Sequence, residues 1–200
     1  RRLQYGPPHN CKRGRVLAAA VKGSGGACAG HPGRGCPGWS TVVNRIDVRL
    51  VRLAHASGLP LPAYHSELAA GLDLMAAVPD DAPISIRPGE RALIPTGLAL
   101  ALPAGIEGQI RPRSGLALSS GVTVLNSPGT IDADYRGELR VLLANFGSDV
   151  FVVERGTRIA QLVFAPSMQA TLCEVESLAE TTRGVAGFGS TGTGRERRAD

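Results

Sequence analysis

The sequence predicts an all-β fold, a β-barrel or jelly roll that contains at most one or two short helices. The 200 residues include 26 Gly and 14 Pro, so turns are frequent and regular elements are short. Aromatic residues make up only 4%, which leaves small apolar side chains to build the core. From about residue 42 onward, short apolar runs closed by Gly, Pro and Asn follow one another, as is typical of barrels and jelly rolls. A hydrophobic content of 43% excludes a wholly disordered chain.

The predicted elements follow the apolar runs in chain order. Val42–Leu53 has a period of two, with Ile46, Val48 and Leu50 on one side against charged residues, and predicts the first strand. The other strands are expected at Leu93–Leu102, Ile106–Ile110, Gly121–Leu125, Glu138–Asn145, Asp149–Val153 and Ile159–Phe164. The turn signals between them are Pro88-Gly89, Pro103-Ala104-Gly105, Pro128-Gly129 and Asn145-Phe146-Gly147. A turn or two of helix is expected only at Glu67–Leu72 and Ser114–Ser120.

The two ends of the chain differ in composition from the middle. Residues 1–40 contain nine Gly, four Pro and no acidic residue, so burial cannot offset the entropy of ordering them. We expect a disordered basic extension at residues 1–40, a folded domain at residues 41–178 and a flexible Gly-rich tail at residues 179–200. An organellar transit peptide or an extension from an upstream translation start are the alternatives for the first segment.

Charge and cysteine usage bear on the partners and the compartment. The net charge of +5 comes from the ends, whereas residues 41–194 have a net charge of −3, so no nucleic-acid partner is expected. No apolar run approaches the roughly 18 residues of a membrane span, and no membrane partner is expected. Three of the four cysteines lie in the first 40 residues, and Cys28, His31 and Cys36 lack the paired spacing of a zinc site. We expect reduced thiols and a cytoplasmic protein.

Five segments carry polar residues and glycines that a core does not need. In the first, Ala69–Leu74, Asp73 lies between two leucines and either faces outward on an edge strand or has a function. The second, Arg111–Ala117, brings together two guanidiniums, a hydroxyl and a Gly amide, which suits either a polyphosphate or a salt-bridged loop.

The third segment, residues 126–138, reads NSPGTIDADYRGE. Asn126 offers the donor and the acceptor that the edge of a base requires. Asp132 and Asp134 could polarise a water or hold a cation through waters, and Tyr135 could pack on a sugar. Taken alone, the segment could equally be a polar hairpin. Strict strand alternation would put Asp132 and Tyr135 on opposite faces, so a turn or bulge is required if both touch one ligand.

The fourth and fifth segments lie near the end of the chain. Gln161 sits inside the apolar run of Arg158–Val163, where an unpartnered amide would cost about 1 to 3 kcal/mol, so a partner is expected. Arg183–Gly192 is not a P-loop, because no Lys follows its second Gly. It is either a solvated linker or a tail that wraps a ligand, with Phe188 stacked on a base.

Together and in this order, the five segments resemble the five motifs of the trimeric dUTPases. The similarity runs from about Asn44 to Gly192 and includes the sequence LPLPAY at Leu59–Tyr64. The resemblance implies a distorted jelly roll that forms a homotrimer, with three active sites at subunit interfaces and each site built from all three chains. It also implies hydrolysis of dUTP to dUMP and pyrophosphate, which limits uracil incorporation into DNA and supplies dUMP for dTMP synthesis.

The resemblance implies a role for individual residues as well. Asp132 would activate the water that attacks the α-phosphorus, and Asp73 would hold waters around a Mg²⁺ ion. Arg113, Ser114, Gly115 and Gln161 would bind the phosphates, Asn126 and nearby hairpin backbone would read uracil, and Tyr135 would pack under the deoxyribose. Thr130 would be a further substrate-binding residue, and Arg183, Phe188, Gly189, Ser190 and Thr191 would come from the third chain's tail.

The sequence departs from the family pattern at Ala186, where the family usually has Gly. If that position needs positive φ, Ala costs about 1 kcal/mol and weakens closure of the tail. Two other functions are considered: dCTP deamination on a similar fold, and a non-catalytic binder on this scaffold. The dUTPase motifs argue against the first, and the presence of Asp73 and Asp132 argues against the second.

Overall fold

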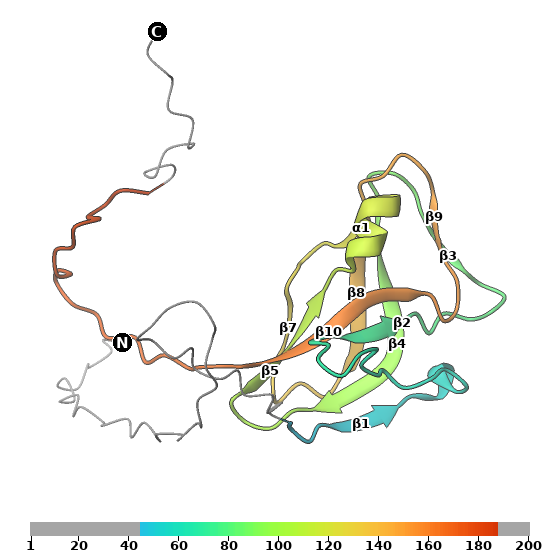
Figure 1. Ribbon diagram of the computed structural model, residues 1–200, viewed down its shortest axis with the longest axis horizontal. Helices are drawn as coiled ribbons and strands as arrows, with labels where there is room; N and C mark the ends of the chain where they lie inside the picture. The colour runs from blue at the N-terminus through green and yellow to red at the C-terminus, as the bar shows by residue number, and fades with distance from the viewer. Residues whose placement is uncertain (1–44, 188–200) are drawn as a thin grey trace, which may run out of the picture. The chain divides into compact units, whose positions relative to one another are not determined.

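A computed structural model of the protein describes residues 45–187, and its ten strands form two four-stranded sheets and a two-stranded ribbon (Figure 1). One sheet has the order β1 (Arg49–Arg52), β4 (Arg91–Ala101), β8 (Glu138–Asn145), β6 (Val122–Val124). The other has the order β2 (Leu72–Met75), β10 (Arg158–Pro166), β5 (Ile106–Arg111), β7 (Gly129–Ile131). The ribbon pairs β3 (Ile84–Ile86) with β9 (Phe151–Val153). The helical elements are the 3-10 turn η1 (Ala54–Ala56) and the helix α1 (Ser114–Ser120).

The two sheets pack through one hydrophobic cluster, as the all-β prediction requires. In β8, Leu139, Val141 and Leu143 are fully buried and alternate with more exposed residues. They share the cluster with Ile110 of β5 and Ile159 of β10 from the other sheet. The period of two therefore buries one face of each strand against the opposite sheet. The fold is all-β and of the jelly-roll type, which confirms the prediction.

Most predicted elements are present, with shifted bounds. The strand at Glu138–Asn145 and the helix at Ser114–Ser120 have the predicted bounds. Of the strand predicted at Val42–Leu53, only Arg49–Arg52 is a strand among the described residues, since residues 45–48 pair with no neighbour. The strands β2, β3 and β7, of three or four residues each, were not predicted.

The helix predicted at Glu67–Leu72 is wrong. This segment makes a single turn, closed by a hydrogen bond from the Ala69 N–H to the Ser66 carbonyl oxygen, and its end enters β2. A side chain at Gly71 would overlap the Gln161 side chain of the neighbouring strand. Close pairing of β2 with β10 therefore decides the conformation here, over any local preference for helix.

A bulge in β4 brings η1 against the sheet. The register between β4 and β8 shifts between the pairs Pro95–Arg140 and Ala99–Glu138. Gly97 lies in the shift with φ +65, where its carbonyl oxygen accepts the Leu53 N–H at 2.8 Å and a Cβ would overlap Ala56. Glycine is required at this position by both the backbone conformation and the close approach.

The other side of η1 is held by an arginine. The Arg155 guanidinium donates to three main-chain carbonyl oxygens, those of His55 (2.8 Å), Ser57 (2.7 Å) and Val78 (3.0 Å). Because the planar guanidinium fixes three acceptors at once, the turn has a defined position between β4 and the loop before β10.

Candidate active site

A cleft of about 500 Å³ opens beside the loop that joins β6 to β7. These two strands lie in different sheets and do not pair with each other, so the predicted hairpin is a connection between the sheets; we keep the word hairpin for this segment and call the space beside it the hairpin cleft. Four of the residues predicted to bind or activate a ligand line it: Asn126, Thr130, Asp132 and Tyr135. The remaining lining residues come from β4, β5, β7 and β8, and are Leu93, Ile110, Gly129, Ile131, Glu138, Arg140 and Leu142. The cleft therefore combines an amide, a hydroxyl, two carboxylates, a guanidinium and a phenol with apolar walls, as small-molecule sites do.

Asn126 lies close against the strand that follows it. A Cβ on Gly129 would be 3.3 Å from Asn126 Nδ2, so the missing side chain leaves room for the amide. The Ser127–Pro128 peptide bond between them is cis. On the other side, the Leu125 N–H donates to the Leu142 carbonyl oxygen at 2.9 Å, which attaches the hairpin to β8.

A tight turn places Asp132 and Tyr135 on the same cleft. The Tyr135 N–H donates to the Asp132 carbonyl oxygen at 3.2 Å, so strand alternation is interrupted between the two residues. This confirms that a turn intervenes. Asp134 does not line the cleft, and geometry therefore favours Asp132 over Asp134 as the carboxylate that faces a bound ligand.

The Tyr135 ring is fixed by contacts with the two residues that lead into β8. Its hydroxyl donates to the Glu138 carbonyl oxygen at 3.1 Å. A Cβ on Gly137 would overlap the phenol, so the ring packs directly over the backbone of that glycine. The phenol face has a defined orientation before any ligand binds.

Glu138 is a cleft residue that sequence reasoning missed. Its carboxylate, 10% exposed, accepts hydrogen bonds from the Gly97 N–H (2.8 Å), His55 Nε2 (2.8 Å) and Arg140 Nε (3.1 Å). Burial acts to raise the pKa of Glu138, but the hydrogen bonds from His55, Gly97 and Arg140 outweigh it and hold the pKa below its usual value. The bulge that aims the Gly97 N–H arises from pairing of distant strands and leaves no local pattern.

A second polar group, the Asp73 cluster, consists of Asp73, His65, Arg113, Arg158 and Gln161. The Asp73 carboxylate contacts Arg113 Nε at 3.2 Å, His65 Nε2 at 3.3 Å and Arg158 Nε at 3.7 Å. Gln161 faces Asp73 across the β2–β10 ladder. Sequence reasoning predicted Asp73, Arg113 and Gln161 in one site but missed Arg158 and His65.

Gln161 is satisfied, as its place in an apolar strand required. Its Nε2 donates to the Pro112 carbonyl oxygen at 2.9 Å, and its side chain lies over Gly71. The neighbouring Ser114 and Gly115 begin α1, and a Cβ on Gly115 would meet nothing within 4 Å. Arg111, the other guanidinium of the second segment, is instead bound to Gln109.

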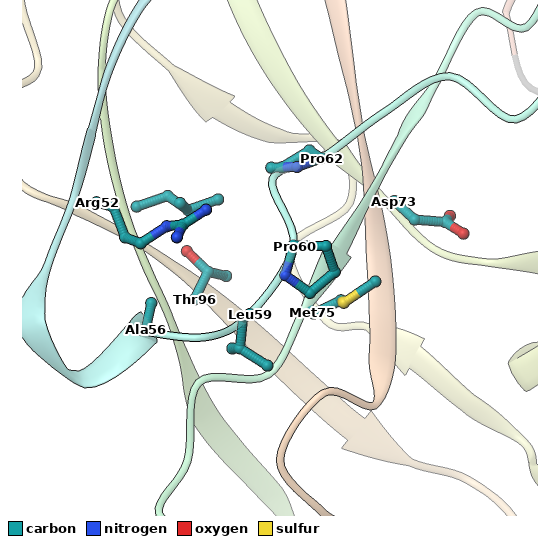
Figure 2. A pocket seen from close by; sticks show the side chains of 9 residues that line it. Arg52, Ala56, Leu59, Pro60, Pro62, Asp73, Met75 and Thr96 are labelled. Atoms are coloured by element: carbon teal, nitrogen blue, oxygen red, sulfur yellow. The ribbon is translucent and has the colours of Figure 1, made fainter.

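The hairpin cleft and the Asp73 cluster are separate within one chain. No member of the cluster lines the hairpin cleft. Asp73 instead borders a space of about 10 Å³, room for about one water, between the loop after η1 and strands β2 and β4. Figure 2 shows Asp73 at the edge of this space, with its carboxylate directed away from Arg52 and Thr96.

The segment that follows β10 is exposed and carries large apolar side chains among polar ones. From residue 167 to residue 187 it has no helix or strand, and Met168 (98%), Leu172 (92%) and Leu178 (86%) are almost fully exposed.

The end of the described segment contains Arg183 and Ala186. Arg183 Nε donates to the Ala186 carbonyl oxygen at 3.1 Å. No residue other than glycine has positive φ in the described part of the chain, so Ala186 is not strained in this conformation. The predicted ligand residues Phe188, Gly189, Ser190 and Thr191, like residues 1–44, lie outside the described residues.

The donor set bears on what metal could bind. Among residues 45–187, no three His, Cys, Asp or Glu side chains gather into a metal cage. Asp73 offers a single carboxylate beside two guanidiniums. Such a set could hold Mg²⁺ only together with phosphate oxygens, since Mg²⁺ keeps several waters and is commonly bound by one or two carboxylates plus the phosphates of a substrate. No helix within residues 45–187 is long and apolar enough to cross a membrane.

Comparisons with known proteins agree on one family. Residues 58–192 match the family model described as dUTPase. A deoxyuridine 5'-triphosphate nucleotidohydrolase of Rhizobium etli (strain CIAT 652) is 60% identical over 148 residues, which cover 74% of this chain and 95% of that protein. A protein of the same description from Mesorhizobium japonicum is 63% identical over 146 residues, which cover 73% of this chain and 91% of the relative.

Solved structures share the fold. The dUTPase of Staphylococcus bacteriophage 80alpha, solved with dUPNHPP, has a TM-score of 0.65 and 26% identity, over 73% of this chain and 98% of that chain. A mutant dUTPase from phage phi11 of S. aureus, described with a coordinated structural Mg(II) ion, has a TM-score of 0.59 and 22% identity, over 66% of this chain and 98% of that one.

Proposed function

Because the chain belongs to the dUTPase family and hydrolyses dUTP to dUMP and pyrophosphate, we propose that it acts as a homotrimer whose active sites are shared between copies. The reaction limits uracil incorporation into DNA and supplies dUMP for dTMP synthesis. In each site, the hairpin cleft of one copy binds the nucleoside and the Asp73 cluster of a neighbouring copy binds the triphosphate. The proposal rests on the finding that no member of the Asp73 cluster lines the hairpin cleft of the same chain.

The exposed apolar side chains support assembly with further copies. Leu93 (52% exposed) lines the hairpin cleft, and Leu125 (44% exposed) precedes the cleft residue Asn126 in the chain. A neighbouring copy would cover them and would also cover the apolar segment after β10. Each copy presents one hairpin cleft and one Asp73 cluster, so a closed ring of three copies contains three equal sites.

Base recognition follows from the chemistry of the hairpin. Uracil presents an N3–H between two carbonyl oxygens, and Asn126 offers both a donor and an acceptor. Thr130 and the backbone of the hairpin supply the remaining partners. Cytosine reverses part of this pattern and would leave polar groups unpaired, which is strongly disfavoured. Thymine differs by one methyl group, so close approach of the hairpin must exclude it.

Tyr135 contacts the sugar, and Asp132 contacts the attacking water. The Tyr135 ring, fixed over Gly137, packs under the deoxyribose. Asp132 accepts a proton from a water molecule, and the oxygen of that water attacks the α-phosphorus in line. As the new P–O bond forms, the bond between the α-phosphorus and the pyrophosphate leaving group breaks. The turn that brings both side chains to one cleft makes this arrangement possible.

The triphosphate binds to the Asp73 cluster. Arg113 presents a planar fork of donors that matches phosphate oxygens, and Gln161 adds an amide. Ser114 contributes its hydroxyl, and Gly115 an N–H from the first turn of α1, where N–H groups lack helical partners. Asp73 would hold waters around Mg²⁺, which when bound offsets the negative charge that resists a nucleophile.

The tail of the third copy completes the site. Arg183, Ser190 and Thr191 meet phosphates, Phe188 stacks on uracil, and Gly189 allows the backbone to approach. These assignments follow the family motif, since residues 188–191 lie outside the described part of the chain. We place the enzyme in the cytoplasm, where deoxynucleotide pools are made.

The test is incubation of the protein with each deoxynucleoside triphosphate and magnesium while pyrophosphate is followed. The proposed function predicts pyrophosphate from dUTP alone. Ammonia release from dCTP would indicate a deaminase, and nucleotide binding without product would indicate a non-catalytic binder. Sedimentation of the same sample should give the mass of three chains.

A further inference from the structure

One carboxylate in the Asp73 cluster serves two guanidiniums. The Asp73 side chain is 15% exposed, with Arg113 Nε at 3.2 Å from Oδ1 and Arg158 Nε at 3.7 Å from Oδ2. Arg113 Nη1 also donates to the Arg158 carbonyl oxygen at 3.0 Å. The two guanidiniums are therefore held within reach of one small anion.

The charge of this group is not balanced by the protein. Two guanidiniums face one carboxylate, and His65 adds no negative charge. The Arg158 side chain is 45% exposed and makes no hydrogen bond among residues 45–187, its contact with Asp73 being an ion pair only. Such a guanidinium can turn to a stronger anion at little cost.

Carboxylate and phosphate present similar oxygen pairs to a guanidinium, and phosphate carries more charge. We propose that Asp73 holds Arg113 and Arg158 in the nucleotide-free enzyme at the place that phosphates take, and that Arg158 is a further triphosphate-binding residue. The inference rests on the proposed function, because it concerns the same triphosphate site.

The replacement of the Asp73 carboxylate by phosphates as the partner of these arginines, which we call the exchange, links binding of the cation to binding of the nucleotide. Without a divalent cation, the triphosphate competes with the Asp73 carboxylate for both arginines and is repelled by it. A hydrated divalent cation beside Asp73 would balance its charge and would leave the guanidiniums of Arg113 and Arg158 to the phosphates. The cation and the nucleotide thus favour each other's binding through these side chains.

The first test uses Asp73→Asn, which keeps the shape of the side chain and removes its charge. The probe is the imido analogue of dUTP, bound to the full chain and measured by calorimetry in EDTA and in magnesium. In EDTA, Asp73→Asn should bind the analogue more tightly than the wild type, by about fivefold or more, the lower range of such couplings. The gain in affinity that magnesium gives the wild type should largely disappear.

The matched control is Asp80→Asn, an exposed carboxylate that contacts only Arg155, at 3.8 Å. It should leave both affinities within about twofold of the wild type. If Asp73→Asn binds the analogue in EDTA no more tightly than the wild type, the exchange does not occur. If the wild type fails to bind the analogue even in magnesium, the proposed function itself is wrong.

The second test is Arg158→Gln, with Arg87→Gln as the control at an exposed arginine paired to Glu90. Arg158→Gln should lower affinity for the analogue in magnesium by about tenfold, the loss of one charge-assisted contact, and affinity for dUMP much less. Equal losses for both ligands would assign Arg158 to fold stability, and no loss would remove it from the triphosphate site.

Discussion

The hydroxyl of Tyr135 donates a hydrogen bond of 3.1 Å to the main-chain carbonyl oxygen of Glu138. The carboxylate of that same glutamate accepts the Gly97 N–H at the bulge in β4. The ring that we place under the deoxyribose is thereby tied, through one residue of β8, to an irregularity in the neighbouring strand. Its orientation depends on residues that lie about forty positions away in the sequence.

Gly137→Ala should disturb this ring without touching the rest of the cleft. A Cβ at residue 137 overlaps the phenol, so Tyr135 must move. We expect the KM for dUTP to rise and discrimination against UTP to fall, as steady-state kinetics with both nucleotides would reveal. Tyr135→Phe keeps the ring and loses only the hydrogen bond, and should cost about 0.5 to 1.5 kcal/mol in kcat/KM. A Gly137→Ala enzyme with unchanged selectivity would argue against sugar recognition by this ring.

Asp132→Asn should reduce turnover by about 10² to 10⁴, the usual contribution of a general base, and leave nucleotide affinity nearly unchanged. The measurements are single-turnover pyrophosphate release and calorimetry with the imido analogue. Asp134→Asn is the control, since Asp134 does not line the cleft. A larger effect of Asp134→Asn than of Asp132→Asn would reverse the assignment.

Glu138→Gln should make stability less dependent on pH. The pKa of Glu138 lies below its ordinary value of 4.5 in the folded protein, so its ionised form stabilises the fold above about pH 4.5. That contribution is lost as the pH falls through the folded-state pKa. We expect wild type to exceed the variant by about 1 to 3 kcal/mol at pH 7 and by progressively less below pH 4.5, as measured by urea unfolding.

The control for this change is Glu90→Gln, at a half-exposed glutamate that pairs with Arg87. It should alter stability at pH 7 by less than about 0.5 kcal/mol. A Glu138→Gln difference that stayed constant down to pH 3 would contradict the role of the ionised carboxylate.

Mixed trimers test whether the sites are shared. Asp132→Asn alters the hairpin cleft and Arg113→Gln alters the Asp73 cluster, so each pure trimer should be nearly inactive. After subunit exchange at equal amounts, about a quarter of the sites would combine an intact cleft with an intact cluster from different copies. Activity should recover to about that fraction. If exchange is verified by mass and activity stays at the level of the parents, each chain carries its own complete site.

Deletion of residues 1–40 should leave the trimer and dUTP hydrolysis intact. This segment carries none of the five motifs, and its composition offers no core. We expect a change in unfolding free energy of less than about 1 kcal/mol. Zinc bound by the full chain and absent from the shortened one would instead indicate a metal site at Cys28, His31 and Cys36.

The sequence predicted the elements whose burial follows a simple period. In β8, the alternation of Leu139, Val141 and Leu143 with polar residues is regular, and the predicted bounds agree with the structure. By contrast, β2 has only four residues and carries Asp73 at its second position. Its pairing with β10 decides its conformation, and no local pattern reports that pairing.

Site residues, too, could be predicted only where a local sequence pattern determines their position. Residues of the hairpin could be predicted because they lie close together in the chain and a local turn brings Asp132 and Tyr135 to one side. Glu138 and Arg158 could not be assigned, because their contacts depend on strand register across the sheets. For Glu138 the decisive feature is the bulge at Gly97, and for Arg158 it is a register shift in β10.

The exposed apolar segment after β10 has a consequence for newly made chains. Met168, Leu172 and Leu178 lie in contact with water on a stretch without helix or strand. An extended stretch of this kind is a ready substrate for proteases and a binding site for chaperones. If neighbouring copies cover these side chains in the proposed trimer, assembled chains escape both. The cell would then remove surplus unassembled copies, and the level of active enzyme would follow how fast chains meet rather than how fast they are made.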